Sequence, residues 1–173
     1  MTVTLRIRQD LVAAMLADLR RPHEFAYERV GFMYCKQTAL TSGCLLLACA
    51  YEPIRDDQYI VDDTVGARFD SASIRHAMQF ALQNEVAVFH VHLHEHAGPP
   101  RFSGTDTREM QALMPCFVNV QPNCLHGALI LSTNSASARV WSTDVRGGTP
   151  VRKIVFVGSQ MTFIGQPHET RSI

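Results

Sequence analysis

An alternating run of histidines and other residues is the feature that most constrains this chain. Histidine occupies every second position from His90 to His96, with Val91, Leu93 and Glu95 between them. Successive side chains of a strand point to opposite faces, so a strand here places all four imidazoles on one face. Such a face is poor core material, because each buried ring carries a polar nitrogen that needs a partner. Neutral imidazole is also the commonest protein ligand for zinc. The run therefore predicts a strand that carries a metal site, with a solvated histidine-rich strand as the alternative.

A segment downstream of the histidines offers a further ligand. Pro99 and Pro100 break the chain, and Ser103 and Asp106 then follow at the spacing of one helical turn. The same two residues also suit a helix start without any metal, as an N-cap and as a negative charge near the helix dipole. A catalytic zinc ion commonly takes three protein ligands and leaves its fourth position to water. Two histidines and Asp106 would complete such a set.

The rest of the chain alternates between strand-like and helix-like segments. A period-two pattern predicts a strand at 3–7, and strand-like segments follow at 31–39, 44–54, 86–94, 126–132, 138–141 and 151–157. Helical spacing predicts helices at 11–19, from Ser71 or Ser73 onwards, and from about 103 to just before Pro115. Ile74, Met78, Ala81 and Leu82 form the expected inner face of the second helix. Without repeats or linkers, the pattern predicts a single α/β domain over residues 1–165 and a polar tail at 166–173.

Charge and hydropathy exclude several classes of protein. Lys+Arg and Asp+Glu both count 16, so no basic excess is available to hold a nucleic acid. The longest apolar run, Cys44 to Tyr51, is eight residues, against the roughly 20 of a membrane-spanning helix. Arg6, Arg8 and Asp10 interrupt any signal peptide. The five cysteines form no C-x-x-C pair, which indicates buried reduced thiols. We therefore expect a cytoplasmic protein that binds neither nucleic acid nor membranes.

His-x-His, a short loop and Ser-x-x-Asp together resemble the metal motif of the JAB/MPN (JAMM) zinc metalloproteases. That family also carries an upstream glutamate, followed three residues later by glycine and an apolar strand. Glu28 occupies this place here, followed by Gly31 and then by Phe32, Met33 and Tyr34. The resemblance covers roughly residues 1–158. It implies an α/β fold with a single mixed β-sheet flanked by helices, the cytidine-deaminase-like architecture of the family.

Three neighbouring pairs of histidines could supply the two ring ligands of this motif. We prefer His92 and His94, because the apolar residues before them then form the strand and the ligands lie at its end. The loop to the serine is then one residue longer than is usual in the family, which a Gly-Pro loop absorbs easily. His90 or His96 remains an alternative for one of the two ligands.

The resemblance also implies a role for each site residue. Zinc would be held by His92, His94 and Asp106, and would lower the pKa of a bound water towards about 7. Glu28 would act as general base on that water and pass the proton to the leaving amine. The Ser103 hydroxyl and the metal would stabilise the oxyanion of the tetrahedral intermediate.

The implied activity is that of a zinc-dependent (iso)peptidase, which hydrolyses the bond after the C-terminus of ubiquitin or a ubiquitin-like protein. A short chain of this type is similar to the bacterial stand-alone members encoded beside ubiquitin-like proteins and their activating and conjugating enzymes, including antiphage systems. The expected partners are thus a ubiquitin-like protein or its conjugates, together with those enzymes. Two alternatives remain: a non-catalytic MPN-type scaffold, and a JAB hydrolase that acts on a sulfur-carrier protein or a small conjugate.

Overall fold

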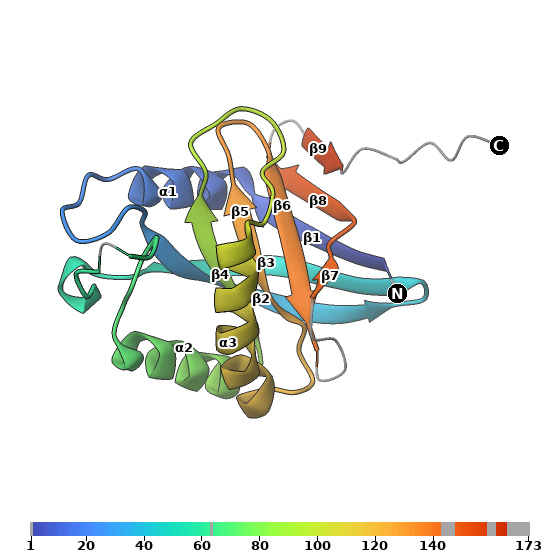
Figure 1. Cartoon of the computed structure of the whole chain (residues 1–173). Helices are drawn as coiled ribbons and strands as arrows, with labels where there is room; N and C mark the ends of the chain where they lie inside the picture. The colour runs from blue at the N-terminus through green and yellow to red at the C-terminus, as the bar shows by residue number, and fades with distance from the viewer. Residues whose placement is uncertain (1, 63, 143–147, 159–161, 166–173) are drawn as a thin grey trace.

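The computed structural model describes residues 2–62, 64–142, 148–158 and 162–165, which form one mixed β-sheet with three α-helices (Figure 1). The strands are β1 (Thr2–Arg8), β2 (Val30–Leu40), β3 (Gly43–Pro53), β4 (Ala87–Leu93), β5 (His126–Leu131), β6 (Ala136–Trp141), β7 (Thr149–Pro150), β8 (Lys153–Val157) and β9 (Thr162–Gly165). The helices are α1 (Gln9–Leu19), α2 (Ser71–Asn84) and α3 (Gly104–Val120), with a short 3-10 helix, η1, at Asp56–Gln58. The expected α/β class with a single mixed sheet is confirmed.

The strand order places β4 inside the sheet. Within the described residues the order is β7-β6-β5-β4-β2-β3-β1-β8-β9. The pairs β1–β3, β1–β8 and β4–β5 are parallel, and the other neighbours are antiparallel. Parallel neighbours need a crossover connection, and α3 provides the one between β4 and β5. The β2–β3 pair is a hairpin, formed by the strands predicted at 31–39 and 44–54 and closed by a two-residue turn before Gly43. A Cβ atom at Gly43 would overlap the backbone oxygen of Thr2, so only glycine lets β1 pair this closely.

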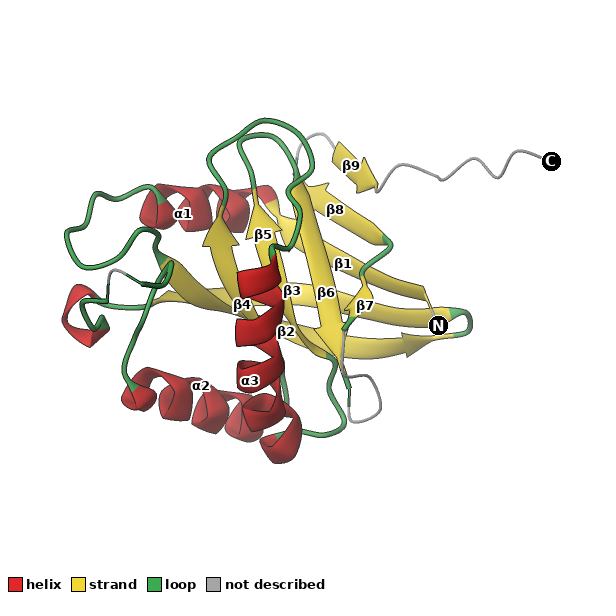
Figure 2. Ribbon diagram, in the orientation of Figure 1, coloured by secondary structure: helices red, strands yellow, loops and turns green. Residues whose placement is uncertain are grey.

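Helices cover both faces of the sheet (Figure 2). One apolar core contains Val12, Met15 and Leu19 of α1 together with alternate residues of the central strands. The second core lies on the other face, where α2 and α3 pack against each other and against β2 and β4. All seven residues of β4 are buried, because both of its faces are covered.

Two details of the helices differ from the sequence-based expectations. Asp70, not Ser71 or Ser73, is the N-cap of α2, and its carboxylate accepts a hydrogen bond from the backbone N–H of Ser73. Leu82 is 57% exposed, whereas Ala77 is fully buried beside Ala81. Ala81 is buried and Ile74 and Met78 pack against the second core as expected, so Leu82 alone falls outside the predicted inner face, to which Ala77 belongs instead.

The third helix is longer than expected. It begins at Gly104 as predicted, but it continues past Pro115 to Val120. A proline inside a helix removes one backbone hydrogen bond and typically costs about 3 kcal/mol. Met114 and Phe117 are buried on either side of it, and their burial offsets that cost. Short-range propensity therefore predicts a helix end that tertiary packing overrides.

The described residues contain two strands, β7 and β9, that the sequence pattern did not predict. The predicted polar tail at 166–173 lies outside the described residues. None of the described helices has the length and apolar character needed to cross a membrane.

Candidate metal site

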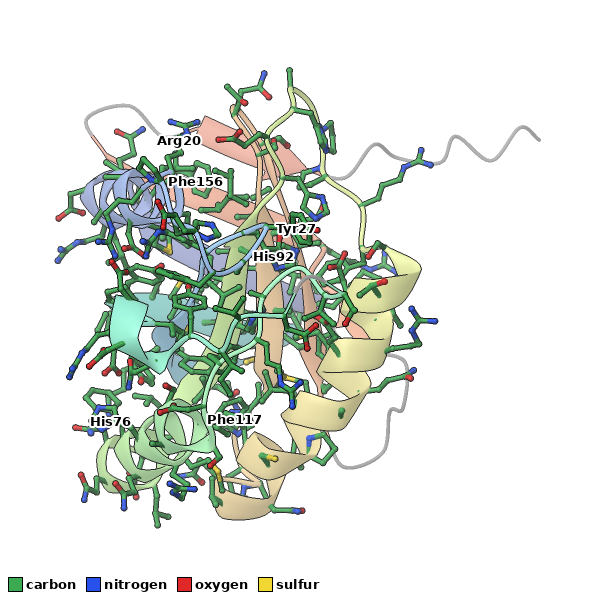
Figure 3. The ribbon with its side chains drawn as sticks, turned by 60° about the vertical axis from the view of Figure 1, so that its left-hand side comes forward. Arg20, Tyr27, His76, His92, Phe117 and Phe156 are labelled. Atoms are coloured by element: carbon green, nitrogen blue, oxygen red, sulfur yellow. The ribbon has the colours of Figure 1, made fainter. Side chains whose placement is uncertain are left out.

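Three segments meet at the carboxyl end of β4. The β2 strand runs antiparallel to β4 and pairs Val30 with His92, so β2 begins where β4 ends. Glu28 lies two residues before Val30 and is carried to the same place. The crossover helix α3 starts beyond the end of β4, which brings Ser103 and Asp106 beside the histidines. Figure 3 labels His92 on the face of β4 that α3 covers.

Four of the predicted side chains converge there. The Nε2 atoms of His92 and His94 are 3.2 Å apart. Asp106 approaches both rings, with Oδ1 3.5 Å from Nε2 of His92 and Oδ2 3.9 Å from Nε2 of His94. Glu28, His92 and His94 each offer a ligand atom within 4.8 Å of the others. The structure thus holds a Glu28, His92 and His94 group that is close enough to bind a metal ion, with Asp106 beside it.

The donor set fits zinc. Two ligands at about 2.05 Å from a tetrahedral ion are about 3.3 Å apart, and the spacings between the two rings and Asp106 lie near that value. Burial lowers the pKa of His92, so its ring is neutral and keeps a lone pair for a metal at neutral pH. One feature is unlike most metal-bound histidines: the Nδ1 atom of His92 is buried and has no hydrogen-bond partner among the described residues. Such a partner commonly strengthens metal affinity by about 10–100-fold.

Ser103 and Asp106 form a capping box at the start of α3. The Ser103 Oγ accepts a hydrogen bond from the backbone N–H of Asp106 at 3.0 Å, and Asp106 Oδ2 accepts one from the backbone N–H of Ser103 at 2.6 Å. Burial raises the pKa of Asp106, but the Ser103 hydrogen bonds and the two imidazoles outweigh it, so the pKa is lowered. The capping explanation and the metal explanation are therefore compatible: Oδ2 holds the helix start while Oδ1 faces His92. The Ser103 hydroxyl only accepts in the capping bond, which leaves its hydrogen available to a substrate.

Glu28 is held beside these residues by a segment that the sequence did not single out. The backbone N–H groups of Tyr27 and Glu28 both donate to the carbonyl oxygen of Gly66. A Cβ atom on Gly66 would overlap Oε1 of Glu28, so glycine makes room for this carboxylate. No sequence pattern around Gly66 predicts this role, because the contact joins segments that are far apart in the sequence.

The environment of Glu28 suits proton transfer. Burial, with smaller contributions from Asp106 and Glu109, raises the pKa of Glu28 to about 7. Both protonation states of the carboxyl group are then populated near neutral pH, which is the condition for an effective general acid or base.

The other two histidines of the run do not join this group. His90 is 6% exposed and lies deeper along β4, with its ring near Phe32 and Phe69. Burial lowers the pKa of His90 to about 3, and its Nδ1 atom has no partner among the described residues. His96 follows the end of β4, and its Nδ1 atom lies 2.9 Å from the backbone oxygen of Ala97. The close-lying group thus contains the preferred pair, His92 and His94.

A cavity of about 920 Å³ leads from the surface to the candidate metal site. Its lining includes Glu28, His94, Ser103 and Asp106, and Tyr27, which is 74% exposed, stands on its rim. The cavity leaves the candidate metal site open to solvent on this side.

Comparisons of the chain with models of known protein families and with curated protein sequences give no match. The likeness to the JAB/MPN family therefore depends on the motif residues and on the way the fold brings them together.

Proposed function

We propose that this protein is a zinc-dependent (iso)peptidase of the JAB/MPN type, with the cytidine-deaminase-like architecture of that family. The observation that carries the proposal is the convergence of His92, His94 and Asp106, at 3.2–3.9 Å from one another, with Glu28 alongside. These residues come from three segments: the β2–β4 pairing brings Glu28 to the histidines, and the crossover helix α3 brings Asp106. Two nitrogens and one carboxylate oxygen are a common zinc ligand set, and a fourth ligand position is then left for water.

Bound zinc would supply Lewis acidity, polarising a substrate carbonyl and making a water molecule more acidic. The protein's own groups handle the protons and the charge. Glu28 takes a proton from the attacking water and delivers it to the leaving amine. Burial raises the pKa of Glu28, which makes its carboxylate a stronger proton acceptor than an exposed one. The Ser103 hydroxyl donates to the oxyanion from a position fixed by the capping box. Asp106 stays ionised throughout, because the Ser103 hydrogen bonds and the imidazoles lower its pKa.

The proposed substrate is the bond after the C-terminus of a ubiquitin-like protein, including its conjugates. The open cavity supports this, since a flexible protein tail can enter it from the Tyr27 side. The partners we propose are a ubiquitin-like protein and the activating and conjugating enzymes that serve it in bacterial, including antiviral, systems.

Metal content gives the first test. We expect about one zinc per chain by elemental analysis of the purified protein. Asp106→Ala and His94→Ala should each lose most of it, since each removes a ligand atom, whereas the matched variant His96→Ala should retain it. Full retention in the first two variants, or loss in the third, would show that the ligand set is wrong.

Cleavage gives the second test. Glu28→Gln should slow release of a fluorogenic amide from the C-terminus of ubiquitin-like proteins by about 10²–10⁴-fold, while His92, His94 and Asp106 continue to hold the zinc. Glu24→Gln is the matched control, because Glu24 is exposed and lies outside the site. If the wild-type protein and the Glu24→Gln control hold zinc but cleave none of these amides, the result favours a binding or scaffold role and overturns the enzymatic proposal.

A further inference from the structure

A second cavity, of about 410 Å³, adjoins the candidate metal site. It lies between α3, the start of α2 and the segment 65–69. Its walls are mainly apolar, with Phe69, Ile74 and Leu113 among them. Glu28, His92 and Asp106 also line it, so the cavity opens directly onto the site. A volume of this size is within the range of small-molecule binding pockets.

The cavity extends away from the metal site along two elements. Asp106, Glu109, Leu113 and Cys116 line it from one face of α3. At 1.5 Å per residue, the stretch from Asp106 to Cys116 covers about 15 Å. On β4 the lining continues from His92 to His90, one pleat or about 7 Å deeper. The cavity, called the chamber below, therefore adjoins the open cavity on the Tyr27 side, with Glu28, Val65 and Asp106 in both linings, and continues away from it along α3 and β4.

Two polar groups in the walls have no role in the proposed mechanism. The His90 ring is more than nine-tenths buried, and its Nδ1 atom has no partner in the described part of the chain. A buried polar atom in this state typically costs about 1–3 kcal/mol, which a bound ligand can recover. The second group is the carboxylate of Glu109, which forms no hydrogen bond or ion pair with any described residue.

The charge of the walls is negative. Asp62 and Arg68 offset one another, since their charged atoms are 2.9 Å apart. A bound dication would compensate Glu28 and Asp106, but not Glu109. Hydrolysis of an amide adds the hydroxyl of water to the carbonyl carbon and a proton to the nitrogen as the C–N bond breaks. It yields a carboxylate on one side and an amine, protonated near neutral pH, on the other. Only the amine complements a chamber whose uncompensated charge is a carboxylate.

We propose that this chamber binds the amine side of the substrate: an alkyl or aromatic group whose nitrogen, at the Glu109 end, becomes the leaving amine. The apolar walls take the body of the group, and Glu109 selects a cation over an anion. This assignment of the leaving-group side rests on the proposed amide hydrolysis at the adjoining site.

Three probes with the same apolar body test the charge preference: 4-phenylbutylamine, 4-phenylbutan-1-ol and 4-phenylbutyrate. Calorimetric titration of the full chain should show that Glu109→Gln weakens binding of the amine by about 3–10-fold, leaves the alcohol unchanged and strengthens the carboxylate. Comparing each probe between wild type and variant cancels any contact with a metal. Glu95→Gln is the matched control, because Glu95 lines only the open cavity, and it should change none of the three.

Filling the chamber tests the location. Leu113→Phe and Cys116→Phe each add bulk to the wall and should abolish binding of all three probes. Their melting temperatures show whether each variant is folded, and either folded variant is sufficient. Unchanged binding in a folded variant, or an amine affinity that does not depend on Glu109, overturns the proposal.

The outcomes also separate this inference from the proposed function. A protein that holds zinc and cleaves ubiquitin-like amides, but has no affinity for the amine probe, refutes the chamber assignment alone. A protein that binds the amine through Glu109, but holds no zinc and cleaves nothing, refutes the proposed function and leaves the chamber as an amine-binding site.

Discussion

The two faces of β4 are equally buried but chemically different. Phe89 and Val91 point towards α1 and belong to a wholly apolar core. One residue along, His90 and His92 point to the side covered by α2 and α3, and each keeps an Nδ1 atom without a partner in the described structure. The Phe89 and Val91 face of the strand therefore stabilises the fold, whereas the His90 and His92 face carries polar groups that reduce stability.

The unpartnered imidazole nitrogens on the histidine face lower the free energy of unfolding, which indicates that these residues serve a function. A buried polar atom without a partner commonly costs about 1–3 kcal/mol, so an apolar residue at either histidine position would give a more stable protein. Perturbed ionisable groups in a cleft are typical of functional sites. The carboxyl end of β4 combines such groups with two adjoining cavities, whereas Phe89 and Val91 on the opposite face line neither of them.

Truncation on the apolar face should have the largest effect. Phe89 is fully buried, and Phe89→Ala should lower the free energy of unfolding by about 3–5 kcal/mol, because it removes buried area and leaves a cavity. Urea denaturation measures this change. Metal binding at the candidate site should be unchanged in the folded fraction, since Phe89 points away from the site. A loss below about 1 kcal/mol would show that this face does not carry the stability assigned to it.

The polar face should respond to pH through Glu28. Burial raises its folded-state pKa from 4.5 to about 7, so folding favours the protonated carboxyl. The metal-free protein should therefore lose stability as pH rises from about 5 to 7, with the loss complete above pH 7. Glu28→Gln removes this dependence and should stabilise the metal-free protein at pH 8 by about 1–3 kcal/mol, with little change at pH 5.

Thermal unfolding in the presence of a chelator, at pH 5 and pH 8, measures the effect. Glu24→Gln serves as the control, since that side chain is exposed, and it should shift neither value. An equal shift for both variants would contradict the burial argument for Glu28.

Replacement of a buried imidazole tests the loss of stability assigned to the histidine face of β4. His90→Phe keeps an aromatic ring beside Phe32 and Phe69 and removes the unpartnered nitrogen. We expect a gain of about 1–2 kcal/mol in the free energy of unfolding. The zinc content should stay unchanged, because His90 lies outside the close-lying ligand group. A destabilised His90→Phe protein would mean that the imidazole makes a favourable contact in solution.

The smallest effect concerns the start of α3. Ser103→Ala removes the hydroxyl that accepts the backbone N–H of Asp106 and caps α3, which should cost about 1 kcal/mol. Under the proposed function it should also slow turnover of the amide substrate. Ser103→Thr keeps a hydroxyl and should recover most of both losses. If Ser103→Ala loses stability but not activity, the hydroxyl caps the helix and has no part in the chemistry.

Several parts of the fold and site follow from local periodicity. The strand period puts His90 and His92 on one face of β4, and the helix period puts Ser103 and Asp106 on one turn of α3. These relations lie within one element, so the sequence is sufficient to predict them. The end of α3 is different, because buried residues beyond Pro115 extend the helix against the local signal.

The sequence by itself thus determined the α/β class, the order of the main elements and that His90 and His92 share a face, but not that β4 ends at Leu93, before His94 and His96. The tertiary structure alone decided that Glu28 lies beside His92, since this depends on the antiparallel register that pairs Val30 with His92. It also decided that Gly66 makes room for the Glu28 carboxylate, and that a chamber opens behind the site along α3. The physical reason is the range of the interactions: dihedral preferences and periodicity act over a few residues, whereas close packing joins segments far apart in the chain.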